Sequence, residues 1–146
     1  MQGRSLGDTL RDGRLMGNNE FPNQQGFAWR DLHGEDRWEA FTPVFGSLTV
    51  VGATSYSGRL RVVGKQCFFQ VKFSAATSIA SVAGTDYLTL HITAKSQGLA
   101  GIATMTNDTT NVAVGVCHID VATSRCYLPS QLASANTFTL AGWYEV

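Results

Sequence analysis

One stretch, residues 65–75, constrains the fold of this chain more than any other. Its apolar and polar side chains alternate, with Cys67, Phe69, Val71 and Phe73 on one side and Gln66, Gln70, Lys72 and Ser74 on the other. Successive side chains of a β-strand point to opposite faces, so the pattern predicts a half-buried strand. Phe68 alone breaks the alternation. The apolar face requires a covering layer, which we expect to be a second β-sheet.

The chain from Trp38 onward is patterned as a series of short strands separated by turn residues. Strands are predicted at residues 38–45 (with Pro43 marking an edge or bend), 47–52, 55–64, 65–73, 86–94, 99–107, 112–121, 125–129 and 137–146. The second pair forms a hairpin through Gly64 and Lys65. The small-residue segments 74–86 and 130–136 are predicted loops. Strands this short, with frequent turns, predict an all-β fold, an antiparallel β-sandwich or jelly-roll-like knob.

The first 40 residues differ in composition from the remainder. They hold five basic and seven acidic side chains, against six and four in all the residues that follow. Glycines interrupt the only helix-like spacing, so we expect a short, mostly irregular N-terminal arm (residues 1–37) before the knob (residues 38–146). Phe21, Phe27 and Trp29 are large aromatics on this polar arm. Two interpretations stay open: they pack on the knob's own flank, or they dock on a neighbouring subunit or larger assembly.

Several classes of protein are disfavoured by the totals. The formal net charge of the 146 residues is zero, so no overall basic field would draw the chain to nucleic acid or to an anionic membrane. No apolar run is long enough to insert into a membrane, and no secretory leader is recognisable, so we expect folding in a cytoplasm. Cys67, Cys117 and Cys126 contain no CxxC pair and are interpreted as core residues rather than disulfide or zinc ligands.

Catalytic patterns are weak throughout. His33, His91 and His118 belong to no HExxH or HxH motif, although His91 and His118 could be neighbours across a sheet. No GxSxG, P-loop or GxGxxG occurs, and Cys117 and His118 should point to opposite strand faces. The four carboxylates of the knob are Asp86, Asp108, Asp120 and Glu145, of which the first two sit at turns. We therefore expect no enzyme, no metal and no cofactor.

Two kinds of binding surface are visible in the strand pattern. Arg59 and Arg61 share one strand face with Lys72 opposite them, which is typical of a solvated face or an intersubunit rim rather than of a nucleic-acid site. Glycan binding requires exposed aromatic platforms. Tyr56, Tyr87, Tyr127 and Trp143 are the candidates, with core or interface packing as the alternative.

Residues 38–146 resemble a β-sandwich domain found at the C-terminal end of tailed-phage and prophage fibre-type proteins. The resemblance is carried by the order of five motifs: WxxFTPxF (38–45), GRLRVVGKQCFFQVKF (58–73), TSIASVAGTDYL (77–88), RCYLP (125–129) and LAGWYEV (140–146). It covers about three quarters of the chain. Residues 1–37 do not match, and no long shaft precedes the knob. These departures favour a small appendage, such as a short spike tip, a head fibre or a capsid decoration protein.

The resemblance implies a virion protein that is assembled in the host cytoplasm and displayed on the particle surface. Its knob would be a homotrimer that attaches to a host surface glycan or protein, and its arm, with Phe21, Phe27 and Trp29, would anchor it to other virion proteins. The alternatives are a capsid cement protein, a glycan-binding module unrelated to phage, and a hydrolase. In a trimer, Phe68 becomes a candidate interface residue, with Arg59 and Arg61 beside it, because a large aromatic on a polar strand face lacks cover in a monomer.

Overall fold

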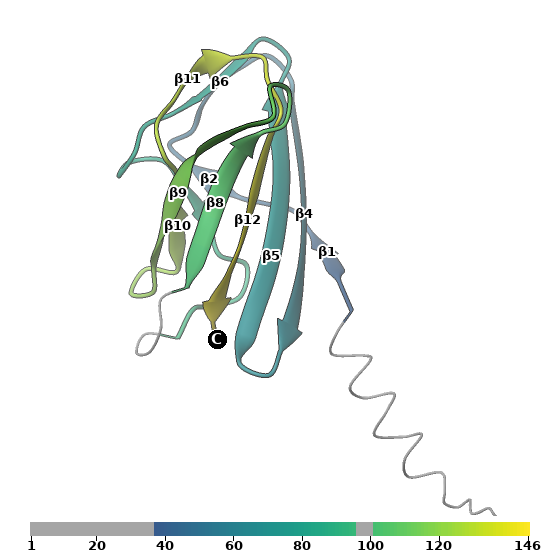
Figure 1. The fold of residues 1–146 in the computed structure, drawn as a ribbon, viewed down its shortest axis with the longest axis vertical. Coiled ribbons are helices and arrows are strands. Elements are labelled where there is room, and N and C mark those ends of the chain that lie inside the picture. Colours follow the sequence, from purple (N-terminus) through teal and green to yellow (C-terminus); the bar gives the residue numbers. More distant parts are fainter. Residues whose placement is uncertain (1–36, 96–100) are drawn as a thin grey trace, which may run out of the picture. The chain divides into compact units, whose positions relative to one another are not determined.

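Every regular element in the described part of the chain is a β-strand. The computed structural model describes residues 37–95 and 101–146 (Figure 1), and no helix occurs in these ranges, which confirms the predicted all-β, sandwich-like fold class. The strands in chain order are β1 (Glu39–Phe41), β2 (Phe45–Gly46), β3 (Thr49–Val51), β4 (Thr54–Val63), β5 (Gln66–Ala75), β6 (Ser78–Ser81), β7 (Tyr87–Thr89), β8 (Ile102–Asn107), β9 (Val112–Asp120), β10 (Arg125–Tyr127), β11 (Gln131–Ser134) and β12 (Phe138–Glu145).

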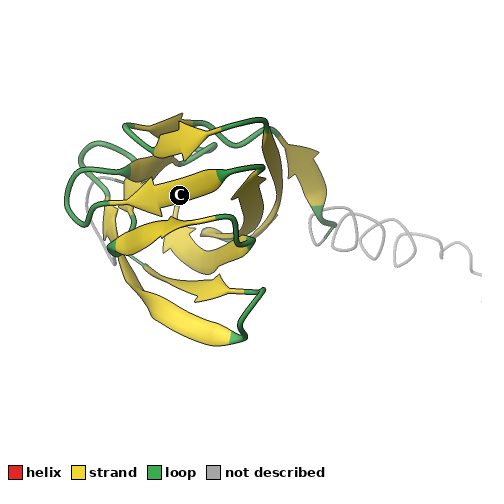
Figure 2. Cartoon of the chain, turned by 90° about the horizontal axis from the view of Figure 1, so that it is seen from above, coloured by secondary structure: helices red, strands yellow, loops and turns green. Residues whose placement is uncertain are grey.

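The larger sheet supplies both layers of the knob. Its nine strands follow the order β1-β4-β5-β12-β8-β9-β10-β7-β2, and the sheet curls into a half-barrel (Figure 2). The curl brings its two ends together, since the ring of Phe45 in β2 lies 4.9 Å from that of Phe73 in β5 and 5.2 Å from that of Tyr56 in β4. The cover for β5 therefore comes largely from the far end of its own sheet, a consequence of the coiling that antiparallel strands adopt, rather than from a separate sheet.

Strand β5 is the centre of the core, as its alternation predicts. Cys67, Phe69, Val71 and Phe73 are buried, while Gln66 and Lys72 are exposed. It pairs along its whole length with β4, through a two-residue turn in which Gly64 has a φ of 61°, the positive value that glycine adopts without strain. The predicted hairpin is thus confirmed. The largest fully buried side chains of the core are Tyr144, Phe73, Phe138, Ile79, Leu88, Met105, Leu128, Leu140 and Val71.

A smaller sheet corrects two of the loop predictions. Strands β11, β6 and β3 pair in that order, so segments 74–86 and 130–136 each contain a strand. Their serine- and alanine-rich composition hides this, because only Ile79 in β6 is a large buried residue. The Ser81 hydroxyl donates a 2.6 Å hydrogen bond to the Pro129 carbonyl oxygen, which ties β6 to the segment entering β11. Long-range pairing, rather than local propensity, makes these strands.

The segment predicted as a first strand, residues 38–45, is also corrected. It forms β1 and β2, which are the two terminal strands of the larger sheet, and Thr42, Pro43 and Val44 cross between them. Pro43 is buried in this crossing, and a Cβ on Gly58 would lie 2.8 Å from the Phe41 ring and 3.0 Å from Pro43. Gly58 in β4 therefore leaves the space that lets the crossing close the sheet.

The cysteines occupy the core, as expected. Cys67, Cys117 and Cys126 are free and buried. Burial raises the pKa of the Cys67 thiol and of the neighbouring Tyr144 hydroxyl, which donates a 2.8 Å hydrogen bond to the Ile92 carbonyl oxygen. These groups are neutral and hydrogen-bonded, so they stabilise the interior and offer no nucleophile to solvent.

Candidate functional site

The outer face of the larger sheet carries the side chain that breaks the β5 alternation. Phe68 points away from the core and is half-buried. Its register partners are Arg61 on β4 and Trp143 on β12, and Trp143 in turn pairs with Ile102 on β8. Three of these four neighbours across the sheet are large and apolar. Cross-strand neighbours lie within side-chain contact, so they form one continuous line.

Trp38, just before β1, extends this line on the other side. The Arg61 guanidinium lies 5.4 Å from the centroid of the Trp38 ring and 5.5 Å from that of Phe68, and the Arg59 guanidinium lies 4.9 Å from Trp38. Each such cation–π contact is worth about 0.5–1 kcal/mol at an exposed site. The line is named here the aromatic–arginine row, with the members Trp38, Arg61, Phe68, Trp143 and Ile102.

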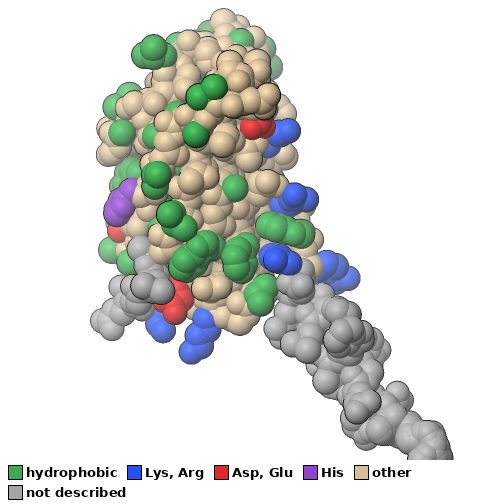
Figure 3. All heavy atoms as spheres, viewed as in Figure 1, with side chains coloured by type: hydrophobic (Ala, Val, Ile, Leu, Met, Phe, Trp, Pro, Cys, Tyr) green, Lys and Arg blue, Asp and Glu red, His purple; other side chains and the backbone are tan. Residues whose placement is uncertain are grey.

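Much of the aromatic–arginine row remains open to solvent in the single chain. Trp38 is 40% exposed and Ile102 is 51% exposed, and Val63 at the adjacent hairpin is 42% exposed. Hydrophobic side chains gather on the lower part of this face beside Lys and Arg side chains (Figure 3). A contiguous apolar patch with an arginine inside it is typical of a protein–protein contact rather than of a solvated surface.

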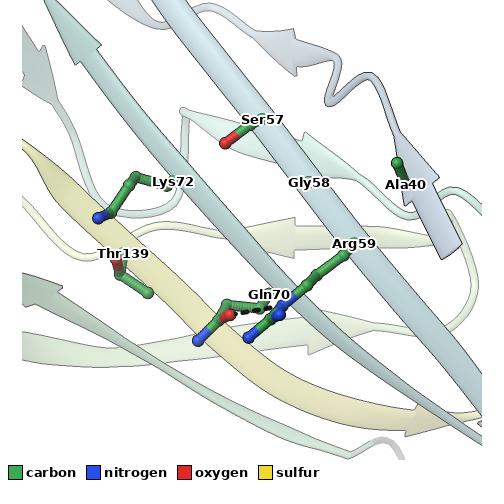
Figure 4. Close-up of a pocket in the computed structure, with 7 residues that line it drawn as sticks. All are labelled: Ala40, Ser57, Gly58, Arg59, Gln70, Lys72 and Thr139. Carbon is green, nitrogen blue, oxygen red and sulfur yellow. Dashed lines mark hydrogen bonds between the residues drawn. The ribbon is translucent and has the colours of Figure 1, made fainter. Parts of the chain in front are cut away.

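A polar groove lies next to the row on the same face. It has a volume of about 450 Å³ and is lined by Ala40, Ser57, Gly58, Arg59, Gln70, Lys72 and Thr139 (Figure 4). Within it Arg59 Nε donates a 2.9 Å hydrogen bond to Gln70 Oε1. Lys72 lies 3.7 Å from Asp108, whose carboxylate also accepts a 2.6 Å hydrogen bond from the Thr139 hydroxyl. The charged groups of the groove are thus largely held by neighbouring side chains, which suits a polar rim around an apolar contact.

The predicted interface residues are brought together by the structure. Arg59, Arg61 and Phe68 lie on neighbouring strands of one face, as the alternation of β4 and β5 requires. Phe21, Phe27 and Trp29, predicted as the docking residues of the arm, lie outside the described residues. The sequence prediction missed Trp38 and Trp143 as members of the same surface. The signal for Trp143 was present, since it alternates with the core residues of β12, as Phe68 does with those of β5.

The tyrosines named as possible platforms lie in different places. Tyr56 packs against Phe45 inside the knob, so it belongs to the core. Tyr87 and Tyr127 are neighbours on the outer face of β7 and β10, with ring centroids 5.6 Å apart. Two of the four candidates therefore form a second aromatic surface, separate in strand order from the aromatic–arginine row.

Catalytic groups do not converge in the described ranges. His118 pairs in register with Tyr127, whereas the His91 ring lies 4.9 Å from that of Phe41, so each histidine has an aromatic neighbour. The buried Asp86 carboxylate accepts a 2.8 Å hydrogen bond from the Val82 amide and stabilises its turn. Among residues 37–95 and 101–146, no cluster of three His, Cys, Asp or Glu side chains could hold a metal ion, and no helix is long and apolar enough to cross a membrane.

No protein-family model, curated protein or solved structure matches the chain. The resemblance to phage fibre-tip domains stays a prediction, and the function is inferred from the geometry of the surface.

Proposed function

We propose that this chain is a bacteriophage virion surface protein whose β-sandwich knob self-associates and attaches the particle to its host. The N-terminal arm would anchor the knob to other virion proteins. The role is one of binding, without a catalytic step or a cofactor. The resemblance of residues 38–146 to fibre-tip domains supports the particle, and the surface of the knob supports the self-association.

The aromatic–arginine row is the observation that carries the self-association. Tryptophan, tyrosine and arginine dominate the energetic centres of protein interfaces, and a polar rim around them excludes water. The row supplies such a centre in Trp38, Phe68 and Trp143, and the polar groove supplies an adjoining rim. We propose that three copies cover the row between them, with Arg59 and Arg61 at the seam.

Attachment by such a knob would depend on avidity. A trimer presents every surface of the chain three times, and a particle carries many trimers. Weak individual contacts with a host surface then combine to exceed a single contact by about two to four orders of magnitude. Assembly and attachment are therefore linked in this proposal, because a dissociated knob would lose most of its effective affinity.

Competition for host cells tests the proposal. Purified full-length chain, added to cells before the phage particle that carries it, should reduce adsorption of that particle. Phe68→Ser should compete much less well, because it weakens the trimer. Val112→Ser is the matched control: it removes an exposed apolar side chain from β9, outside the row, and should compete as well as the unaltered chain. Adsorption that is unchanged at saturating protein would reject host attachment and favour capsid decoration instead.

A further inference from the structure

A second aromatic surface lies on the outer face of β9, β10 and β7. His118, Tyr127 and Tyr87 are consecutive register partners across these three strands. The His118 and Tyr127 rings are inclined by only 22°, with centroids 6.3 Å apart, and Tyr87 stands edge-on to Tyr127 at 62°. Two rings side by side and nearly parallel make a flat platform, and the third ring closes one side of it.

The platform is held in place by its neighbours. The Arg125 guanidinium lies 4.1 Å from the centroid of the Tyr87 ring, and its Nη1 donates a 3.4 Å hydrogen bond to the Tyr127 hydroxyl. On the other side, a Cβ on Gly46 would overlap the Tyr87 ring, so glycine at this position leaves room for the ring to lie across β2. The rings are thus positioned before any ligand arrives, which lowers the entropic cost of binding.

A hollow of about 680 Å³ opens beside the platform, a size that suits a small ligand. Its lining consists of Ala83, Gly84, Val116, His118, Tyr127, Leu128, Pro129 and Ser130. Most of these side chains are apolar, and the polar groups are few. The Ser130 hydroxyl is fixed by a 3.0 Å hydrogen bond from the Ala83 amide, and the turn that carries Ala83 is fixed by Asp86. We call this site the tyrosine–histidine hollow.

The charges around the hollow compensate each other. Arg125 lies opposite Asp120 in the β10–β9 register. Hydrogen bonds from the Thr123 hydroxyl at 2.7 Å and the Ala122 amide at 3.0 Å help to hold the pKa of Asp120 below its ordinary value, so this carboxylate is ionised at neutral pH. With one cation beside one anion, the surface gives no preference for a charged ligand.

We propose that the tyrosine–histidine hollow binds a neutral pyranose saccharide. The apolar C–H face of the sugar ring would lie on the Tyr127 and His118 rings, and its hydroxyl groups would meet the Tyr127 and Ser130 hydroxyls and the His118 imidazole. A proline-rich peptide fits less well, because such peptides dock in slots between aromatic rings, and here Tyr87 stands edge-on to Tyr127. The inference rests on the proposed attachment function for the source of the sugar, a host surface glycan.

Saturation-transfer NMR on the full chain tests this assignment. The probes are the methyl pyranosides of glucose, galactose, mannose and rhamnose, together with N-acetylglucosamine, each at millimolar concentration. At least one probe should receive saturation on its ring C–H protons. Tyr127→Ala should weaken that binding about tenfold, because it removes the stacking ring. Gly46→Ala, which displaces Tyr87, should weaken it while leaving Tyr127 present.

A matched control uses the other described histidine. His118→Ala should reduce sugar binding, whereas His91→Ala removes an exposed imidazole that also lies against an aromatic ring but outside the hollow, and should have no effect. Equal binding by Tyr127→Ala and the unaltered chain, or no saturation transfer to any of the sugars, would overturn the inference. So would binding of a polyproline peptide that Tyr127→Ala abolishes while no sugar binds.

Host-cell competition separates this inference from the proposed function. Competition that persists while no sugar binds rejects the hollow as a saccharide site and leaves attachment in place. Sugar binding without competition supports the hollow and rejects attachment.

Discussion

Replacing Phe68 by serine should separate assembly from folding, because Phe68 and Phe69 are sequence neighbours on opposite faces of β5. Phe68 is half-buried in the isolated chain, so at most about a third of a side chain of about 200 Å² remains for a neighbouring copy to cover. At about 25 cal/mol per Å², that area contributes about 1.7 kcal/mol per copy, or about a 15-fold change in association. The isolated fold should lose only about 1 kcal/mol, mainly the contact with Arg61.

Phe69→Ser is the matched comparison. Phe69 is 3% exposed and packs edge-on against Tyr144, with ring centroids 5.8 Å apart. Its replacement leaves a cavity and a buried hydroxyl, which should cost about 3–5 kcal/mol of folding free energy. The two variants therefore differ by several kcal/mol in the fold, although the substitution is the same and the positions are adjacent.

Urea unfolding at two protein concentrations distinguishes the two effects. The unaltered chain should unfold at a higher urea midpoint when it is more concentrated, because association stabilises the folded state. Phe68→Ser should lose this concentration dependence and keep a midpoint close to that of the dilute unaltered chain. A Phe68→Ser midpoint as low as that of Phe69→Ser, with the concentration dependence retained, would mean that Phe68 is a second core position and would refute the interface argument.

Three further changes follow from the packing. Gly58→Ala should lower the free energy of unfolding by about 1–3 kcal/mol, because its Cβ would meet Phe41 and Pro43, whereas Ser57→Ala next to it should change the urea midpoint little. Tyr144→Phe should cost about 1–2 kcal/mol in the same assay, since it leaves the Ile92 carbonyl without its donor; an unchanged midpoint would contradict that role. Deleting residues 1–37 should leave the circular dichroism and melting of the knob intact and abolish its incorporation into particles, and incorporation of the truncated chain would reject the anchoring role of the arm.

The sequence was informative wherever one strand carried its own pattern. The alternation of β5, its hairpin with β4 and the faces of β12 were all predictable, because each depends on the period of two within a single segment. The same rule predicted Phe68 as a solvent-face aromatic. Serine- and alanine-rich strands such as β6 escaped prediction, because pairing with β3 and β11 makes them strands.

The candidate site was predictable only in part, for a related reason. The aromatic–arginine row depends on register between segments far apart in the chain: Trp143 meets Phe68 across β12 and β5, and Trp38 reaches Arg61 beside β1. A local pattern places each residue on a face but does not say which residues share a line across the sheet. The split of residues 38–45 between the two ends of the larger sheet has the same origin.

Sedimentation equilibrium of the full chain tests the central claim, that the outer face of β1, β4, β5 and β12 is covered by further copies of the chain. The expected mass is that of three chains of 15.7 kDa each, falling toward the mass of a single chain when Trp143 is replaced by serine. A single-chain mass at every concentration of the unaltered protein would contradict the claim.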